Sequence, residues 1–290
     1  MYGTIKQFIK PQKSLFMETI KGALDLNIAV LIDADNVSSS KIEGILDEVK
    51  RHGTPSIKRI YGDWTSAYVA GWKAPLLTHA ITPIQQYSYT TGKNSTDSAL
   101  IIDAMDMLHT QKVDGFCIVS SDSDFTRLAI RLRESGKVVL GIGQKKTPKP
   151  FIAACDKFIY IEILGDDRNE VNAVITEPQV KDRELPEKGA DKQNETESIS
   201  NNFIRLLKNT INDVADESGW ASLAEIGALL NKRKPDFDPR IYGFMKLTPF
   251  FKSLDKYFEI EEKNVENSKI KHVYIKNKEN KRPIRGKAKK

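Results

Sequence analysis

Aspartates follow two short apolar segments of this chain. Asp33 comes directly after the segment 28–32, Ile-Ala-Val-Leu-Ile, and Asp122 and Asp124 follow the segment 116–119, Phe-Cys-Ile-Val, after two serines. Apolar runs of this length are typical of buried strands. If the strands are parallel, their carboxyl ends share one edge of the sheet, where open α/β sheets place their ligands. No Lys or Arg lies beside these acids, so the pattern predicts a site for a divalent cation.

Asp97 is a further candidate, near the start of a predicted helix over 96–110 that Ser95 or Thr96 could cap. Alone, an acid in a first helical turn is explained by the helix dipole. Several carboxylates gathered at one sheet edge, however, repel one another unless a cation neutralises them. Mg²⁺ and Mn²⁺ take carboxylate and water oxygens as ligands. Because such ions activate water and stabilise charge on phosphate, the acids predict phosphoryl-transfer chemistry.

Two more acids lie close to these motifs. Asp35 is two residues beyond Asp33 and stays a candidate. Asp103 lies six residues after Asp97, about 240° further round a straight helix at roughly 100° per residue. We therefore expect Asp103 to support the site or to serve the structure. The four histidines lie away from the motifs and are expected on the surface or at helix ends: His52, His79, His109 and His272.

Strand-like and helical segments alternate through the first half of the chain. Six segments are predicted strands: 28–32, 56–61, 82–87, 115–120, 137–142 and 158–162. Helical patterns lie between them at 39–52, 64–79, 96–110 and 124–135. Ser39 and Ser40 are suited to cap the first helix, and Gly136 to follow the last. This alternation predicts βαβ units and a parallel sheet.

The rhythm changes after residue 164. The segment 165–200 is polar, holds five basic and ten acidic residues, and reads as a flexible linker. Apolar residues then recur at helical spacing in three stretches, which precede two strand-like runs at 257–261 and 272–276. This pattern predicts a small helical domain with a β-hairpin wing. Residues 268–290 hold ten basic residues against one acid, which suits contact with a polyanion or a solvated terminus.

Composition indicates a globular protein of one large or two modest domains. The 290 residues are 40% hydrophobic and 29% charged, and the net charge is +6. We find no apolar run long enough to span a bilayer and no apolar core of a signal peptide near the N-terminus. Cys117 and Cys155 lie in separate apolar stretches and are expected to be buried, reduced thiols. The expected location is cytoplasmic.

Residues 27–164 resemble the NYN domain, a branch of the PIN-like metal-dependent ribonucleases. Six segments carry the resemblance in order: 32–36 (Ile-Asp-Ala-Asp-Asn), 61–64 (Tyr-Gly-Asp-Trp), 93–97 (Lys-Asn-Ser-Thr-Asp), 102–106, 120–125 and 141–148. The resemblance implies an α/β fold, a three-layer α/β/α sandwich around a parallel sheet, with Mg²⁺ or Mn²⁺ as cofactor. It implies roles as metal ligands or water-orienting groups for Asp33, Asp97, Asp122 and Asp124, and a polar role beside them for Asn36.

Residues that could hold RNA surround these motifs. We expect four loop residues to contact RNA phosphates: Lys93, Lys145, Lys146 and Thr147. Five aromatic residues could stack on bases, although packing in the core or its rim is the favoured interpretation: Trp64, Tyr68, Trp72, Tyr87 and Tyr89.

Residues 202–277 resemble the OST-HTH domain, also called LOTUS. The resemblance rests on 219–223 (Gly-Trp-Ala-Ser-Leu), 226–227, 235–240 and 242–247. It implies a small winged-helix-like α+β fold that binds RNA or, in some members, a helicase partner. A recognition-type helix is expected within 240–251, and Arg240, Lys246 and Lys252 would contact phosphates. The alternative is that these three cations are ordinary solvated residues.

Together these observations predict five parts: an N-terminal extension (1–26), the nuclease domain (27–164), the acidic linker (165–200), the RNA-binding domain (201–277) and a basic disordered tail (278–290). The leading hypothesis is a metal-dependent ribonuclease that acts on RNA phosphodiesters. The second is an RNA-binding regulatory module with a weak or inactive site. The third is a haloacid-dehalogenase-like phosphohydrolase, because Asp33-Ala34-Asp35 after a strand fits its Asp-x-Asp opening, although Asn36 and Val37 depart from that family's pattern.

Overall fold

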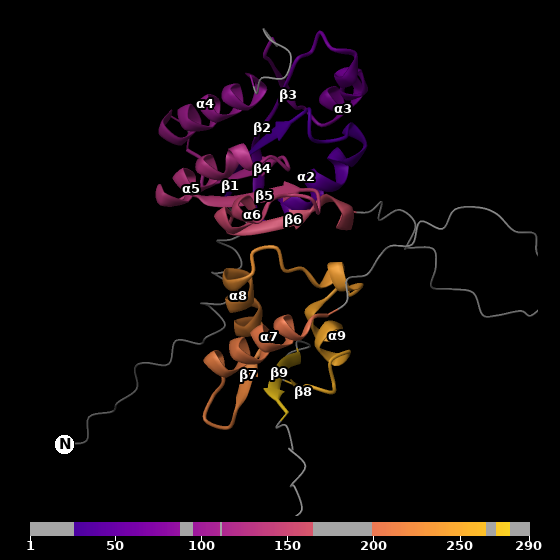
Figure 1. Cartoon of the computed structure of the whole chain (residues 1–290), viewed down its shortest axis with the longest axis vertical. Coiled ribbons are helices and arrows are strands. Elements are labelled where there is room, and N and C mark those ends of the chain that lie inside the picture. The colour runs from indigo at the N-terminus through magenta and orange to yellow at the C-terminus, as the bar shows by residue number, and fades with distance from the viewer. Residues whose placement is uncertain (1–25, 88–94, 111, 165–198, 265–270, 279–290) are drawn as a thin grey trace, which may run out of the picture. The chain divides into compact units, whose positions relative to one another are not determined.

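The computed structural model describes residues 26–87, 95–110, 112–164, 199–264 and 271–278. The chain divides into two compact units, residues 1–176 and 177–290 (Figure 1). The predicted N-terminal extension, the linker and the basic tail lie almost wholly outside the described residues, so these three assignments stay predictions. No helix within the described ranges has both the length and the apolar character needed to cross a membrane.

The first unit is built on a six-stranded parallel sheet. Its order is β3-β2-β1-β4-β5-β6. The strands are β1 (Asn27–Asp33), β2 (Thr54–Gly62), β3 (Thr82–Gln85), β4 (Gly115–Val119), β5 (Val138–Gly143) and β6 (Lys157–Tyr160). Each coincides with a predicted strand to within two residues at either end, and the predicted parallel α/β class is confirmed.

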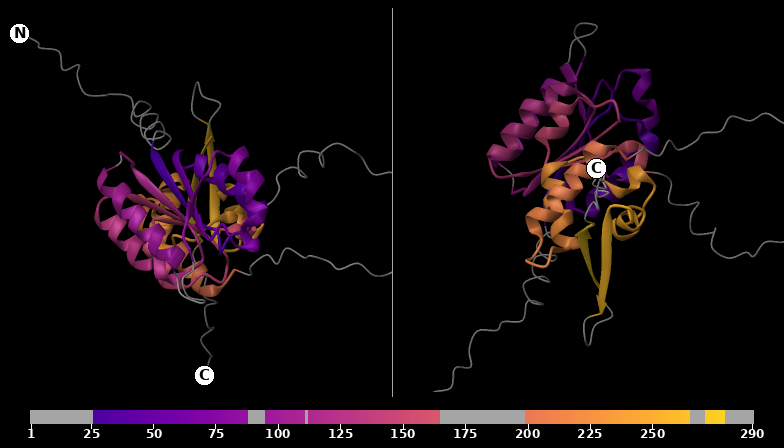
Figure 2. Two further views of the ribbon diagram at one scale, coloured as in Figure 1. Left: turned by 90° about the horizontal axis from the view of Figure 1, so that it is seen from above. Right: turned by 60° about the horizontal axis from the view of Figure 1, so that its bottom comes forward.

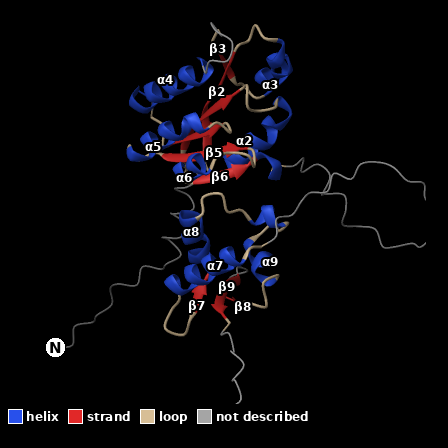
Figure 3. Ribbon diagram, viewed as in Figure 1, coloured by secondary structure: helices blue, strands red, loops and turns tan. Residues whose placement is uncertain are grey.

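Helices cover both faces of this sheet (Figure 2). On one face lie α2 (Ile42–Lys50) and α3 (Lys73–Thr78), and on the other lie α4 (Ser95–Thr110), α5 (Thr126–Glu134) and α6 (Lys149–Ala154). Figure 3 shows the alternation of strands and helices that the sequence pattern predicts. The short helix α6 was not predicted, because six residues that begin Lys-Pro give too short a pattern to separate from a loop.

Three predicted helices begin later than expected, because a 3₁₀ turn precedes each α-helix. These turns are η1 (Ser39–Lys41) before α2, η2 (Ala67–Trp72) before α3 and η3 (Ser123–Phe125) before α5. The predicted caps Ser39 and Ser40 were wrong: Ser38 is the N-cap of η1, where its side chain accepts from the Ser40 amide over 3.4 Å, and Lys41 is the N-cap of α2. Because η1 comes first, the capping serine lies closer in sequence to the end of β1 than predicted.

The central strands are buried, as their apolar sequences predict. All five residues of β4 and all but the first of β1 are buried. The face of α2 that packs on them carries Ile42, Ile45, Leu46 and Val49. Cys117 and Cys155 are buried free thiols whose pKa values burial raises, which confirms the expectation for them.

The second unit combines helices with a small antiparallel sheet of order β7-β9-β8. Its elements are α7 (Asn201–Val214), β7 (Trp220–Ser222), α8 (Leu223–Arg233), η6 (Pro239–Tyr242), α9 (Leu247–Lys252), β8 (Phe258–Asn264) and β9 (Lys271–Asn277). Stacked Phe203 and Tyr242, with Phe237 and Phe250 beside them, form an aromatic core. The predicted helical domain and hairpin are confirmed. The three-residue strand β7 was missed because it is too short to show alternation.

The segment 240–251 is not one continuous helix. Gly243 has a φ of 82°, in the left-handed region that glycine adopts without strain, and it ends η6. The chain then re-enters a helix at Leu247. The α-helix in this segment is therefore α9, and the recognition role expected for it stays a prediction.

Candidate metal site

The aspartates identified in the sequence surround the point where the strand order reverses. β1 and β4 are neighbours in the sheet, with β2 on one side and β5 on the other. Asp33 is the last residue of β1, and Ser120 follows β4 directly. In open α/β sheets, ligands bind outside the carboxyl ends of the strands at such a switch point. The fold thus places the predicted residues where a ligand site is expected.

Asp33 is the buried foundation of this site, with a side chain only 1% exposed. Its Oδ2 atom accepts from Ser120 Oγ over 2.8 Å and from Asn36 Nδ2 over 2.6 Å, and its Oδ1 atom accepts from the Asp35 amide over 3.1 Å. Burial raises the pKa of Asp33, while these three hydrogen bonds act in the opposite direction. The Asp33 carboxylate therefore holds the residues that follow β1 and β4 in place through these hydrogen bonds.

Asp122 and Asp124 are held by the turn that follows β4. The Asp122 amide donates to Ser120 Oγ over 3.1 Å, which ties it to the same serine that Asp33 binds. The Asp122 Oδ1 atom accepts from the Asp124 amide over 2.9 Å and caps η3. Two carboxylates thus project from a single 3₁₀ turn.

Asp97 completes the group from the first turn of α4, as predicted. Asp97, Asp122 and Asp124 each offer an oxygen, and these three atoms lie within 4.8 Å of one another. Partial burial raises the pKa of Asp97 to about 7, helped by repulsion from Asp33, Asp122, Asp124 and Asp35. Hard oxygen donors with excess negative charge are the arrangement that Mg²⁺ and Mn²⁺ bind. The residues present fit such an ion.

Three residues at the end of β1 and just after it lie outside this cluster of three carboxylates: Asp33, Asp35 and Asn36. The charge of Asp33 acts on Asp97, but the oxygens of Asp33 lie outside the cluster of three. Asn36 is half-buried and uses its amide group on Asp33. Asp35 is exposed, and its backbone amide, not its carboxylate, is seen to support Asp33.

Asp103 anchors the helix that carries Asp97, as the rotation along α4 predicts. Its carboxylate accepts from the Arg59 guanidinium and from the Tyr61 hydroxyl, both on β2. Arg59 and Tyr61 are two residues apart, so they point to the same face of the strand. Sequence reasoning missed these two partners, although that period-two spacing opposite a helix acid was the available signal.

A second set of bonds joins β4 to β5. The Gln144 amide donates to Ser121 Oγ over 2.8 Å, and the Thr147 hydroxyl donates to the Gln144 carbonyl over 2.6 Å. A Cβ at Gly143 would lie 2.6 Å from the Ser120 carbonyl oxygen, so only glycine permits this approach. The carboxyl ends of β1, β4 and β5 are therefore joined by hydrogen bonds, from Ser120 to Asp33 and from Gln144 to Ser121.

The residues expected to bind RNA in the first unit are distributed as follows. Lys145 and Lys146 are exposed in the loop after β5. Thr147 is 5% exposed, and its hydroxyl bonds within its own turn. Lys93 lies outside the described residues. The structure thus leaves two lysines of this set open to a phosphate.

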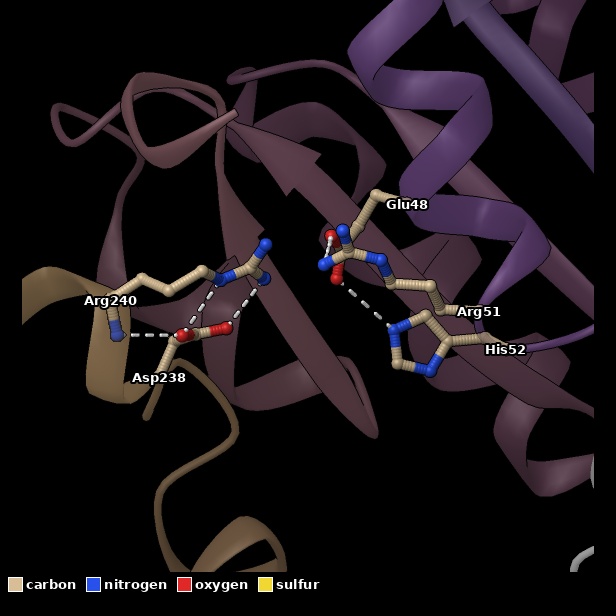
Figure 4. A network of polar contacts seen from close by, with 5 residues as sticks. All are labelled: Glu48, Arg51, His52, Asp238 and Arg240. Carbon is tan, nitrogen blue, oxygen red and sulfur yellow. Dashed lines mark hydrogen bonds and ion pairs between the residues drawn. The ribbon is translucent and has the colours of Figure 1, made fainter. Parts of the chain in front are cut away.

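In the second unit, two of the three expected cations are engaged. Arg240 pairs with Asp238 through both ends of its guanidinium, with Nε to Oδ1 at 3.0 Å and Nη2 to Oδ2 at 2.7 Å (Figure 4). The Lys252 ammonium pairs with Glu262 at 2.7 Å. Lys246 is exposed. Lys246 is therefore the better placed of the three for a phosphate.

Of the five aromatic residues considered for base stacking, two are packed as the favoured interpretation holds, and one of the others is exposed. Trp72 is 2% exposed, and the Trp64 indole donates to the Ile84 carbonyl over 3.0 Å. Tyr87 is 55% exposed and could meet a base. Tyr89 lies outside the described residues, as does the side chain of Tyr68.

Comparisons with known proteins fall on the two units separately. The NYN domain family matches residues 27–162, and the OST-HTH/LOTUS domain family matches residues 194–270. A solution NMR structure of an uncharacterized protein from Nitrosomonas europaea is 31% identical and covers 35% of this chain and 92% of its own, with a TM-score of 0.26. A crystal structure of a protein of unknown function from Vibrio parahaemolyticus is 20% identical and covers 49% of this chain and 94% of its own, with a TM-score of 0.41. A search of curated proteins found no match.

Proposed function

Because the chain carries an NYN domain followed by an OST-HTH/LOTUS domain, we propose that it is a ribonuclease dependent on Mg²⁺ or Mn²⁺. The observation that supports this most directly is the group of three carboxylate oxygens from Asp97, Asp122 and Asp124 within 4.8 Å. An NYN domain is a PIN-like nuclease domain, and the acids stand at the ligand-binding edge of its sheet.

In this proposal Asp97, Asp122 and Asp124 hold the metal ion. Asp33 and Asn36 belong to the site as well, because Asp33 acts electrostatically on Asp97 and orients Asn36. A metal ion bound there supplies an activated water and neutralises charge on the phosphate. Lys145 and Lys146 are proposed to hold the RNA backbone beside the acids.

The second domain is proposed to bring RNA to this site. OST-HTH membership suggests nucleic-acid binding, and Lys246 is the exposed cation of the expected contact segment. A protein partner is the other occupant to consider for this domain. The site and the second domain thus divide cleavage and recruitment between them.

The phosphohydrolase alternative fits the structure poorly. In that chemistry the first aspartate of Asp33-Ala34-Asp35 would attack phosphate as a nucleophile. Asp33 is instead 1% exposed, and both its oxygens accept hydrogen bonds from neighbouring groups. A carboxylate enclosed in this way supports the neighbouring residues and is not positioned to attack a phosphate.

The test is cleavage of single-stranded RNA by the full chain with Mg²⁺ or Mn²⁺, with and without EDTA. Asp97→Asn and Asp122→Asn should abolish metal-dependent cleavage. Asp106→Asn is the matched control, because Asp106 lies on the same helix as Asp97 but is exposed and outside the cluster. Cleavage that persists in EDTA and in both cluster variants would refute the proposal. Metal binding with intact RNA would favour the regulatory-module alternative.

A further inference from the structure

The helix α5 carries two arginines that belong neither to the family motifs described above nor to the proposed metal site. Its buried face carries Leu128, Ala129 and Leu132. Arg127 and Arg131 are exposed and four residues apart, so they lie on one side of the helix, about 6 Å apart along its axis. The helix thus turns a pair of guanidinium groups toward solvent.

These two arginines differ from the others of the first unit in their pairing. Arg51 pairs with Glu48 at 3.1 Å, as Figure 4 shows, and Arg133 pairs with Asp156 at 3.0 Å. Arg59 pairs with Asp103. Within the described part of this unit, Arg127 and Arg131 are the two arginines whose guanidinium groups make no hydrogen bond or ion pair. Their charge is therefore available to an external anion.

The position of α5 links this charge to the acidic site. The turn η3, which carries Asp124, runs directly into α5, so Arg127 lies one turn beyond Asp124. α6 packs against both α5 and η3, and its first residue, Lys149, is exposed. Exposed cations therefore extend from the metal site along one helical layer. An RNA strand that enters a cluster of carboxylates needs such cations to hold its flanking phosphates.

We propose that the exposed edge of α5 is a binding track for RNA, in which Arg127 and Arg131 contact backbone phosphates on one side of the nucleotide held at the aspartates. The inference rests on the proposed function for its substrate class. It adds a directional element, because the track leaves the site along α5. The contacts are to phosphates, so they carry no base preference.

The test measures binding of an unstructured RNA oligonucleotide by fluorescence anisotropy as a function of salt concentration. The full chain carries Asp122→Asn, so that RNA stays intact. Adding Arg127→Gln with Arg131→Gln should weaken binding and reduce the slope of log K against log salt by about 1.4, since each phosphate contact on a single strand contributes about 0.7. Arg127→Lys with Arg131→Lys keeps both charges and should preserve most of the slope.

Arg133→Gln is the control, because it lies on the same helix but is engaged with Asp156. It should leave the slope unchanged. An unchanged slope in the double Gln variant, or an equal fall in the Arg133→Gln control, overturns the inference. A double Lys variant that falls as far as the double Gln variant also overturns it. Because cleavage is not measured, loss of the nuclease proposal and loss of this track are separate outcomes.

Discussion

The Ser120 hydroxyl donates to the Asp33 carboxylate over 2.8 Å across 87 residues of sequence. The same hydroxyl oxygen accepts from the Asp122 amide. One serine therefore fixes a buried carboxylate on β1 and the backbone of an aspartate of the acidic cluster after β4. The geometry of the acidic cluster depends on a residue that carries no charge itself.

Replacing this serine should cost both stability and activity. Ser120→Ala leaves the buried Asp33 carboxylate one hydrogen bond short, so we expect a loss of about 1.5–3 kcal/mol in unfolding free energy, the range for bonds to charged groups. Urea unfolding measures this loss. Ser123→Ala, at an exposed position in η3, is the control and should be nearly neutral. Equal stability of the two variants would contradict the assigned role.

The stability of the metal-free protein should fall as pH rises toward neutrality. The folded state raises the pKa of Asp97 from 3.8 to about 7, so between these values it binds more protons than the unfolded chain. The favourable contribution is complete below the unfolded pKa and is lost as pH passes through about 7. Thermal unfolding in EDTA at a series of pH values measures this trend.

Two comparisons test the pH dependence. Asp97→Asn should flatten the decline, and Mg²⁺ should raise the unfolding temperature more at high than at low pH, because protons compete with the metal for the same carboxylates. A metal-free protein whose stability rises over this interval would contradict the sign of the Asp97 shift.

Loss of the α4 anchor should disturb the site from a distance. Tyr61→Phe preserves the buried ring but removes the hydroxyl that donates to Asp103, so we expect a cost of about 1.5–3 kcal/mol in unfolding free energy. Because α4 carries Asp97, metal affinity should fall as well. Calorimetric titration with Mn²⁺ measures it. Unaltered metal affinity in a destabilised Tyr61→Phe protein would limit Asp103 to a purely structural role.

The glycine at the end of β5 should resist substitution. Gly143→Ala would place a Cβ 2.6 Å from the Ser120 carbonyl oxygen and 2.8 Å from Thr147 Oγ1. Because the first contact is with backbone, we expect a loss of about 1–3 kcal/mol in unfolding free energy, as for overpacking. Gly44→Ala is the matched control: its Cβ meets Leu164 at an ordinary 3.5 Å inside α2. That change should be neutral or stabilising.

Arg240 should behave as a structural residue when it is replaced. Asp238 is 7% exposed, so Arg240→Ala leaves a buried carboxylate without its guanidinium, and we expect about 3–5 kcal/mol of destabilisation of the second unit. Lys246→Gln should keep the stability and lower RNA affinity. Unfolding and anisotropy measurements on both variants separate the two effects. A stable Arg240→Ala protein with weakened RNA binding would reverse this assignment.

The sequence predicts the sheet and its acidic edge well, because both rest on local patterns. Apolar runs such as 28–32 and 116–119 are typical of buried strands. Because the strands are parallel, the aspartates that follow them lie at the same edge of the sheet. The rotation from Asp97 to Asp103 along a helix likewise predicted that the two acids would face different neighbours: Asp97 lies in the carboxylate cluster, and Asp103 pairs with Arg59.

Local sequence patterns do not predict hydrogen bonds between residues that are far apart in the chain. No local pattern indicates that Ser120 would bond to Asp33, which lies 87 residues earlier in the chain. Arg240 was expected to contact a phosphate because of the family resemblance, yet Asp238, two residues before it, takes the guanidinium. Residue type identifies the possible chemistry, but the tertiary partner decides whether a charge remains available.

The adjacency of β1 and β4 also bears on how the protein is made. Strand β4 begins at Gly115, so a growing chain that has passed Asp33 and Asp97 still lacks both the central neighbour of β1 and the turn with Asp122. Such non-local pairing forms late, because a long loop must close first. A complete acidic cluster thus requires that synthesis has passed Asp124, and shorter nascent chains would lack the proposed activity.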